Sequence, residues 1–222
     1  LAAGMHGLVV AGSTGEAVLL DEAERERLLE TARAVTPRDR LLIAGIGAEA
    51  TRTVIRRARH AASTGVDAVL VVSPYYYRSA MTPDVLLRHF RRVADESPIP
   101  VVLYNIPKYV GFAILPATVA DLASHPNIIG IKDSSGDRDQ LTGYLGAQSE
   151  SFTVLTGSGT LFQTALAAGA RGGILAVALF ALPLSLAIYD AMARNDSGAA
   201  VAAQSRLAPL AATIVGGLGV AG

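Results

Sequence analysis

The 222-residue sequence contains no cysteine. Disulfide bonds, thiolate metal sites and a cysteine nucleophile are therefore excluded together. A chain without cysteine is typical of a reducing compartment, and we expect the protein to be cytoplasmic. Any covalent catalysis must use a different nucleophile.

An excess of charge of one sign is also lacking, because Lys and Arg number 19 and Asp and Glu number 19. A neutral chain has no overall field that would gather nucleic acid or an anionic membrane. No apolar run reaches the roughly 18 residues of a membrane span. The opening LAAGMHGLVV lacks the charged start of a signal peptide. We therefore expect neither nucleic acid nor a membrane as a partner.

Metal-ligand and nucleotide motifs are missing as well. No P-loop, G-x-S-x-G or H-E-x-x-H occurs. The four histidines fall in predicted helices or connecting loops and nowhere at ligand spacing: His6, His60, His89 and His125. We therefore expect no metal and no cofactor, which leaves amine chemistry as the leading candidate.

Short runs rich in Val, Ile and Leu are present, and they alternate with longer stretches of helical period. Seven such runs are predicted strands: residues 7–12, 41–46, 68–73, 100–105, 127–132, 152–157 and 172–177. Strands that are apolar on nearly every residue must be covered on both faces. This pattern predicts a parallel sheet wrapped by helices.

The stretches between these runs carry helix start and stop signals. Asp21 and Glu24 form a capping box, and Thr82 precedes a proline at another helix start. A third helix opens at Thr51 and ends at Gly65. Apolar stripes predict the buried faces of these helices: Leu28, Ala32 and Val35; Leu86, Phe90 and Val93; Val54, Ala58 and Ala61. Shorter helices are predicted near 116–124, 137–148 and 159–169.

Polar side chains recur at the C-terminal ends of many predicted strands, which favours an α/β fold of the closed (β/α)8 TIM barrel type. An open doubly wound sheet would show G-x-G-x-x-G after its first strand, and GLVVAGSTGE lacks it. Because seven strands are visible, we expect the first strand and the last C-terminal helices to lie outside this sequence. Residues 1–222 are predicted to form one barrel domain, in which 183–222 begin the C-terminal helical region.

Lys132 stands at the end of the apolar run IIGIK, where a charged amine is costly to bury. Most strand-end lysines reach solvent. In a barrel, however, this position points into the mouth, where burial favours a neutral, nucleophilic amine that forms Schiff bases with ketones. Asp133 should point to the opposite side of the strand and leave Lys132 unpaired. Tyr104 ends the preceding strand and is either a core tyrosine or a proton shuttle beside the imine.

The stretch G-S-T-G-E leaves the first predicted strand with two hydroxyl groups, Ser13 and Thr14, next to Gly15. Ser13 and Glu16 stand at capping-box spacing, so the stretch can be a simple turn. Its hydroxyls and backbone N–H groups can equally bind a carboxylate. The remaining strand ends give weaker signals: S-P-Y-Y-Y-R at 73–78, G-S-G at 157–159 and G-G-I at 172–174.

Four motifs in this order, G-S-T-G-E, P-Y-Y, Y-N-I-P and G-I-K-D, resemble those of the dihydrodipicolinate synthase/N-acetylneuraminate lyase family of class I pyruvate aldolases. The resemblance covers essentially the whole chain. It implies a barrel with a C-terminal helical extension, assembled as a homo-oligomer, either dimer or tetramer. It also implies a lysine imine with pyruvate or a related 2-oxo acid, formed without a cofactor.

The resemblance also implies roles for individual residues. Lys132 matches the imine-forming lysine, and Tyr104 matches the proton-shuttling tyrosine of the Y-N-x-P motif. Ser13 and Thr14 match the hydroxyl pair that binds the substrate carboxylate. Tyr76 matches the tyrosine that, in dihydrodipicolinate synthases, reaches into a neighbouring subunit's site to complete a catalytic proton relay with Ser13 and Tyr104.

Two further positions line the implied pocket. Ile174 matches a residue whose backbone carbonyl faces the substrate. Tyr109 stands where synthases of the lysine pathway have an arginine for the second substrate's carboxylate. Lys108 stands beside it, but a flexible ammonium does not reproduce a bidentate guanidinium. The cation at this position is therefore absent.

Other stretches, S-P-I-P-V-V-L-Y and H-P-N-I-I-G-I-K-D-S-S-G-D among them, are similar to the 4-hydroxy-2-oxoglutarate aldolase branch. We therefore expect a class I aldolase that condenses pyruvate with an aldehyde, or releases the two by the reverse cleavage, through a lysine imine, with 4-hydroxy-2-oxoglutarate as the favoured substrate. The alternative is a 4-hydroxy-tetrahydrodipicolinate synthase that condenses pyruvate with aspartate semialdehyde. A non-catalytic barrel that binds 2-oxo acids and a phosphate-binding barrel remain open.

Overall fold

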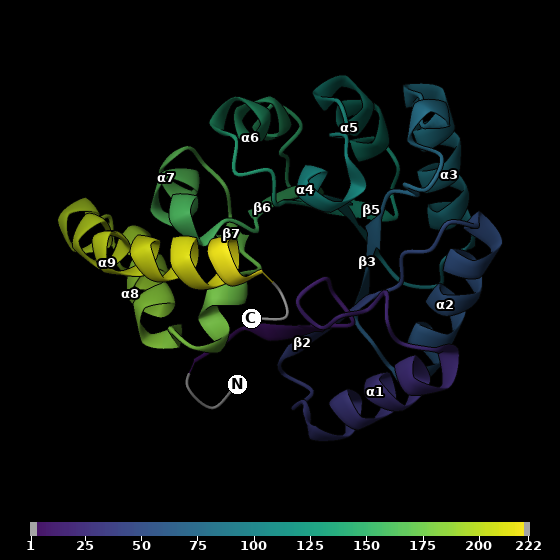
Figure 1. The fold of residues 1–222 in the computed structure, drawn as a ribbon, viewed down its shortest axis with the longest axis horizontal. Helices are drawn as coiled ribbons and strands as arrows, with labels where there is room; N and C mark the ends of the chain where they lie inside the picture. Colours follow the sequence, from purple (N-terminus) through teal and green to yellow (C-terminus); the bar gives the residue numbers. More distant parts are fainter. Residues whose placement is uncertain (1–3, 220–222) are drawn as a thin grey trace.

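The computed structural model describes residues 4–219, which form a seven-stranded parallel sheet in the order β1 to β7. The strands are β1 (Gly7–Val10), β2 (Leu41–Gly45), β3 (Ala68–Val72), β4 (Val101–Asn105), β5 (Ile128–Asp133), β6 (Thr153–Thr156) and β7 (Gly172–Gly173). Each strand pairs only with its neighbours in sequence, so the sheet curls around a central axis with the helices outside it (Figure 1). The predicted α/β alternation is confirmed.

Helices follow most strands and cover the outside of the sheet (Figure 1). They are α1 (Glu22–Val35), α2 (Thr51–Thr64), α3 (Pro83–Glu96), α4 (Pro107–Val110), α5 (Pro116–Ala123), α6 (Arg138–Leu145), α7 (Phe162–Ala167), α8 (Leu182–Ala193) and α9 (Ser197–Leu210). Short turns of helix are η1 (Arg78–Ala80), η2 (Gly159–Leu161), η3 (Ala176–Leu179) and the π-helical η4 (Ala211–Leu218). Closure of the barrel by an eighth strand stays a prediction.

Alternation along the strands separates two apolar layers. Val71 and Leu103 pack outward against the helices, in one cluster with Phe90. Leu70 and Tyr104 point the other way, into a smaller cluster inside the curled sheet. Because side chains alternate along a strand, the inward position of Tyr104 at the end of β4 is fixed by the outward packing of Leu103.

The predicted capping box of α1 is confirmed, and of its predicted buried stripe Ala32 is buried, whereas the positions of Leu28 and Val35 are wrong. Val35 is exposed, and Leu29 rather than Leu28 enters the core. The helix is rotated because Arg25 and Arg33 are buried on its inner face, where their guanidinium groups donate to backbone carbonyls. The terminal nitrogens of both arginines are therefore paired in the interior, whereas the buried Nε atom of each has no hydrogen-bond partner among the described residues.

The next two long helices follow their sequence signals. Gly65 ends α2 with φ +82°, in the left-handed region that favours glycine. Thr82 caps α3 by accepting a hydrogen bond from the Val85 N–H at 3.4 Å. The predicted apolar stripes of both helices are buried: Val54, Ala58, Ala61, Leu86, Phe90 and Val93.

The seventh strand is shorter than the predicted run of residues 172–177. Only Gly172–Gly173 pair with β6, and the chain then turns into η3 from Ala176. Glycine weakens a strand because it has no side chain to pack on the sheet. The strand therefore ends after the two glycines, and the apolar run that follows forms helical turns.

The C-terminal region begins with α8, and α9 packs against it through Ala200, Ala203 and Leu207. Within residues 4–219, one continuous helical stretch, Ser197–Leu218, is long and apolar enough by composition to cross a membrane, contrary to the sequence expectation. This is weak evidence for a span, because packed helices of globular proteins meet the same criteria. The assignment of residues 1–222 to one domain stays a prediction.

Candidate active site

Strands β4 and β5 bring Tyr104 and Lys132 side by side. The two residues are paired in the parallel register, and both are buried. The Lys132 Nζ atom lies 4.2 Å from the centroid of the Tyr104 ring. Lys132 retains 8 % of its exposure, so its amine is enclosed by protein at the strand ends. A primary amine next to a phenol is the pair that imine chemistry requires.

Asp133 points away from Lys132, as the alternation of the strand predicts. Its carboxylate accepts hydrogen bonds from the Asn105 Nδ2 group at 2.7 Å and the Ser135 hydroxyl at 2.7 Å. Among the ion pairs of residues 4–219, none involves Lys132. Burial raises the pKa of Asp133, although the hydrogen bonds from Asn105 and Ser135 act in the opposite direction.

Ser13 reaches the same place from the loop after β1. Its Oγ atom lies 3.4 Å from the Tyr104 hydroxyl, and either group can donate. The loop turns through backbone bonds, from Gly15 N–H to the Gly12 carbonyl at 3.1 Å and from Glu16 N–H to the Ser13 carbonyl at 3.1 Å. The Ser13 side chain is therefore not used as a helix cap and is available to Tyr104.

Arg25 supports this loop from below, a role that the sequence analysis missed. It donates to the Gly45 carbonyl at 3.0 Å and the Ala17 carbonyl at 2.5 Å, which ties the loop to β2. Burial lowers the pKa of Arg25, with a further contribution from Arg57. An arginine within the predicted apolar face of α1 was the available sequence signal.

The other predicted site residues are not drawn into contact with Lys132 within a single chain. Thr14 and Tyr109 are exposed, and Lys108 Nζ lies 5.8 Å from the centroid of the Tyr109 ring. Ile174 donates its N–H to the Thr156 carbonyl at 2.9 Å, next to β6. Tyr76 is 73 % exposed. The roles of these residues stay predictions.

Gly157, the first residue of the G-S-G stretch after β6, lies against the side chains of Lys132 and Ser134. A Cβ atom there would lie 2.9 Å from Lys132 Cε and 1.9 Å from Ser134 Oγ. We expect Gly157→Ala to displace the lysine and to lower kcat by about 10-fold, because catalysis is sensitive to small misplacements. Steady-state kinetics would measure this effect.

Gly146→Ala is the matched control for this substitution. Gly146 has φ −61°, and an added Cβ would approach the Gly143 carbonyl oxygen no closer than 3.4 Å. An unchanged kcat in Gly157→Ala would show that the lysine does not need this space.

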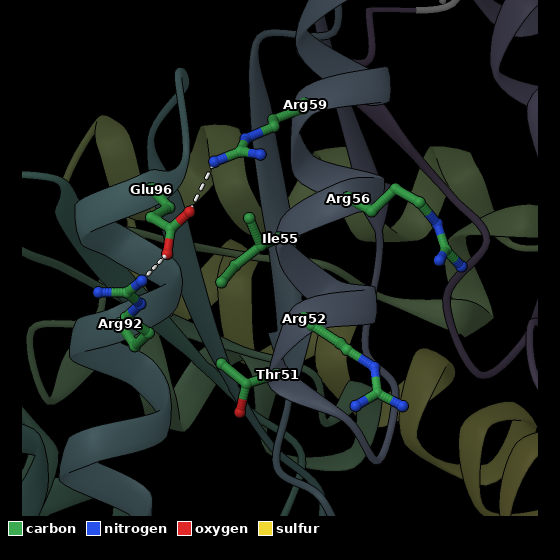
Figure 2. A pocket seen from close by; sticks show the side chains of 7 residues that line it. All are labelled: Thr51, Arg52, Ile55, Arg56, Arg59, Arg92 and Glu96. Carbon is green, nitrogen blue, oxygen red and sulfur yellow. Dashed lines mark hydrogen bonds and ion pairs between the residues drawn. The ribbon is translucent and has the colours of Figure 1, made fainter.

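A cavity of about 420 Å³ lies outside the sheet, between α2 and α3 (Figure 2). Arg59 and Arg92 both turn toward Glu96, at 2.6 Å and 2.5 Å, whereas Arg52 and Arg56 extend from the other flank of α2. None of the predicted site residues lines this cavity. It is an ion-pair groove on the helical layer and is separate from the amine at the strand ends.

Among residues 4–219, no group of three or more His, Asp or Glu side chains is arranged to hold a metal ion.

A family model settles the classification. The model of the dihydrodipicolinate synthetase family matches residues 1–218. The chain belongs to this family. Membership places it among the carbon–carbon lyases that include class I pyruvate aldolases, as the motifs at the strand ends indicate.

Several proteins similar in sequence to this chain are 4-hydroxy-tetrahydrodipicolinate synthases. The chain is 41 % identical to the 4-hydroxy-tetrahydrodipicolinate synthase of Acidiphilium cryptum, over 95 % of this chain and 71 % of the relative. It is 41 % identical to that of Xanthomonas axonopodis pv. citri, over 90 % of this chain and 65 % of the relative.

Solved structures of the same family share the fold. The dihydrodipicolinate synthase of Acinetobacter baumannii, in complex with pyruvate, gives a TM-score of 0.91 at 29 % identity, over 97 % of this chain and 73 % of that chain. The enzyme of Aquifex aeolicus gives 0.91 at 31 % identity, over 96 % and 72 %.

Proposed function

We propose that this chain condenses pyruvate with aspartate semialdehyde through an imine on Lys132, as a 4-hydroxy-tetrahydrodipicolinate synthase. The observation that carries the proposal is the buried Lys132 beside Tyr104, whose hydroxyl lies 3.4 Å from Ser13. The named synthases at 36–43 % identity support this substrate pair over 4-hydroxy-2-oxoglutarate, which the sequence alone had favoured.

The chemistry follows from the three side chains. The Lys132 amine attacks the C2 ketone of pyruvate, and Tyr104 passes the proton that lets the carbinolamine lose water. The imine then accepts electrons when a C3 proton leaves, which gives an enamine. The enamine carbon bonds to the aldehyde carbon, whose oxygen takes up a proton. The amino group of the semialdehyde part then attacks the imine carbon, which closes the ring and releases the Lys132 amine as the leaving group.

In this proposal the carboxylate of pyruvate binds the hydroxyl pair of Ser13 and Thr14 and the backbone near Gly15. The turn at Gly15 leaves Thr14 and Gly15 exposed on the loop, and Ser13 lies next to Tyr104. Tyr76 is directed toward solvent, so we expect it to act in a neighbouring subunit of a homo-oligomer rather than in its own site.

Borohydride reduction in the presence of pyruvate tests the imine. The intact protein should gain one reduced pyruvate, located by peptide mapping at one of its two lysines, Lys132. A protein that gains no such mass does not use this mechanism. If the protein is trapped by pyruvate but turns over no aldehyde, it is a non-catalytic barrel that binds 2-oxo acids. If inorganic phosphate raises its unfolding temperature and pyruvate does not, it is a phosphate-binding barrel.

Cleavage of 4-hydroxy-2-oxoglutarate is a second candidate, favoured by Tyr109. This exposed phenol occupies the position where the resemblance implies an arginine for the semialdehyde carboxylate. Assays of pyruvate release from 4-hydroxy-2-oxoglutarate and of condensation with aspartate semialdehyde, run on the same preparation, separate the two activities.

Tyr109→Arg should raise kcat/KM for aspartate semialdehyde by about 10-fold, because a guanidinium binds a carboxylate in a bidentate manner. Pyruvate trapping at Lys132 should be unchanged. Tyr109→Phe keeps the ring without adding charge and is the control. Equal kcat/KM values in all three proteins would show that residue 109 does not contact the aldehyde substrate.

A further inference from the structure

Asn105 and Asp133 form a buried cross-strand pair directly behind the site. The two residues are register partners at the last positions of β4 and β5, and their exposures are 1 % and 2 %. The Asn105 Nδ2 group donates to Asp133 Oδ1 at 2.7 Å. Asn105 directly follows Tyr104, and Asp133 directly follows Lys132. Because side chains alternate along a strand, the pair lies on the outer face of the sheet.

Both members of this pair also accept hydrogen bonds from the loops that follow them in the chain. Asn105 Oδ1 accepts the Ile114 N–H at 3.0 Å, which anchors the loop after α4. Asp133 accepts the Ser135 N–H at 3.1 Å and the Ser135 hydroxyl at 2.7 Å, which anchors the loop after β5. Buried polar groups with all partners in place hold one geometry, because leaving any of them unpaired is costly.

Side chains on one strand alternate between faces, so rotation of the outer residue carries the inner residue with it. On the inner face, Tyr104 has apolar contacts and one long side-chain hydrogen bond, 3.4 Å to Ser13, and Lys132 stacks its Nζ over the Tyr104 ring. Apolar contacts fill space but do not fix direction as hydrogen bonds do. The shorter and more directional hydrogen bonds at the ends of β4 and β5 are therefore those of the outer face.

We propose that Asn105 and Asp133 are positioning residues, which lock the ends of β4 and β5 so that the Lys132 amine and the Tyr104 hydroxyl face one substrate carbon. The inference rests on the proposed imine chemistry at Lys132. It assigns to the asparagine of Y-N-I-P and the aspartate of G-I-K-D a function on the face of the sheet opposite to the substrate.

Asn105→Ala tests the pair. We expect kcat for condensation to fall by about 30-fold, because a misplacement of about 1 Å at reacting groups costs up to 10²-fold. The KM for pyruvate should change less than threefold, since Ser13 and Thr14 lie on another loop. The rate of borohydride trapping at a saturating pyruvate concentration should fall with kcat.

Asn127→Ala is the matched structural control. Asn127 precedes β5 at its opposite end, and its amide donates to the Ala94 and Ser97 carbonyls at 2.9 Å each. This substitution also removes an amide network from the same strand. We expect it to lower the unfolding temperature by a similar amount while kcat stays within twofold of the wild-type value.

The exchange of charges gives a second test. Asn105→Asp places two carboxylates in contact and should lower kcat more than Asn105→Ala does. In the double variant Asn105→Asp/Asp133→Asn, kcat should be at least about fivefold higher than in Asn105→Asp. A fall in kcat equal to that of Asn127→Ala, or no recovery in the double variant, would overturn the positioning role. Failure of the wild-type protein to be trapped by pyruvate would instead refute the proposed function itself.

Discussion

Replacement of Lys132 by methionine should abolish the borohydride-trapped pyruvate adduct and lower turnover by at least about 10⁴-fold, because it removes the only atom that can bond to the ketone. Methionine is unbranched and of similar length, so it fills the enclosed space beside Tyr104 without a new charge. The expected result is a folded protein with no adduct, checked by intact-protein mass spectrometry and circular dichroism.

Lys108→Met is the matched control, since Lys108 is the chain's other lysine and is exposed in α4. It should keep the adduct and most of the turnover. An adduct that persists in Lys132→Met but disappears in Lys108→Met would move the reacting amine to the other lysine and refute the site described above.

Tyr104→Phe should lower kcat by about 10²-fold, which is the lower range for loss of a positioned proton-transfer group. The ring that lies under Lys132 Nζ is retained, so the change isolates the hydroxyl and its contact with Ser13. The adduct should still form, but more slowly. Stopped-time borohydride trapping measures the rate of imine formation directly.

Ser13→Ala and the double variant complete this test. If the Ser13 and Tyr104 hydroxyls act as one relay, the double variant should lose little more than Tyr104→Phe alone. Multiplicative losses would show that the two hydroxyls act independently. Tyr189→Phe, in α8, serves as a control for the removal of a tyrosine hydroxyl elsewhere.

Much of the site could be predicted from the sequence because of one regularity of barrels. Parallel strands place their C-terminal ends at one edge, so polar residues that follow apolar runs are brought together. Lys132 and Tyr104 end two neighbouring strands, Ser13 lies in the loop after a third, and they meet for this reason. Alternation within β5 likewise predicted that Asp133 would face away from the lysine.

The parts that could not be predicted depend on contacts between distant segments. The rotation of α1 follows from hydrogen bonds of Arg25 and Arg33 to carbonyls far along the chain, which helical periodicity does not reveal. The pairing of Asn105 with Asp133 requires the register between β4 and β5. The role of Gly157 likewise depends on how closely β6 approaches the lysine stem.

The arginine beneath the first loop has an electrostatic consequence for substrate capture. Arg25 is 5 % exposed, and the neighbouring Arg57 and Glu22 largely offset one another, so the wall under the Ser13 loop carries a net positive charge. Mobile ions screen such an enclosed charge far less than a surface charge. If the Ser13 loop binds the carboxylate as proposed, this buried charge should favour an anionic keto acid there, and the effect should persist in salt concentrations that abolish long-range steering by exposed residues.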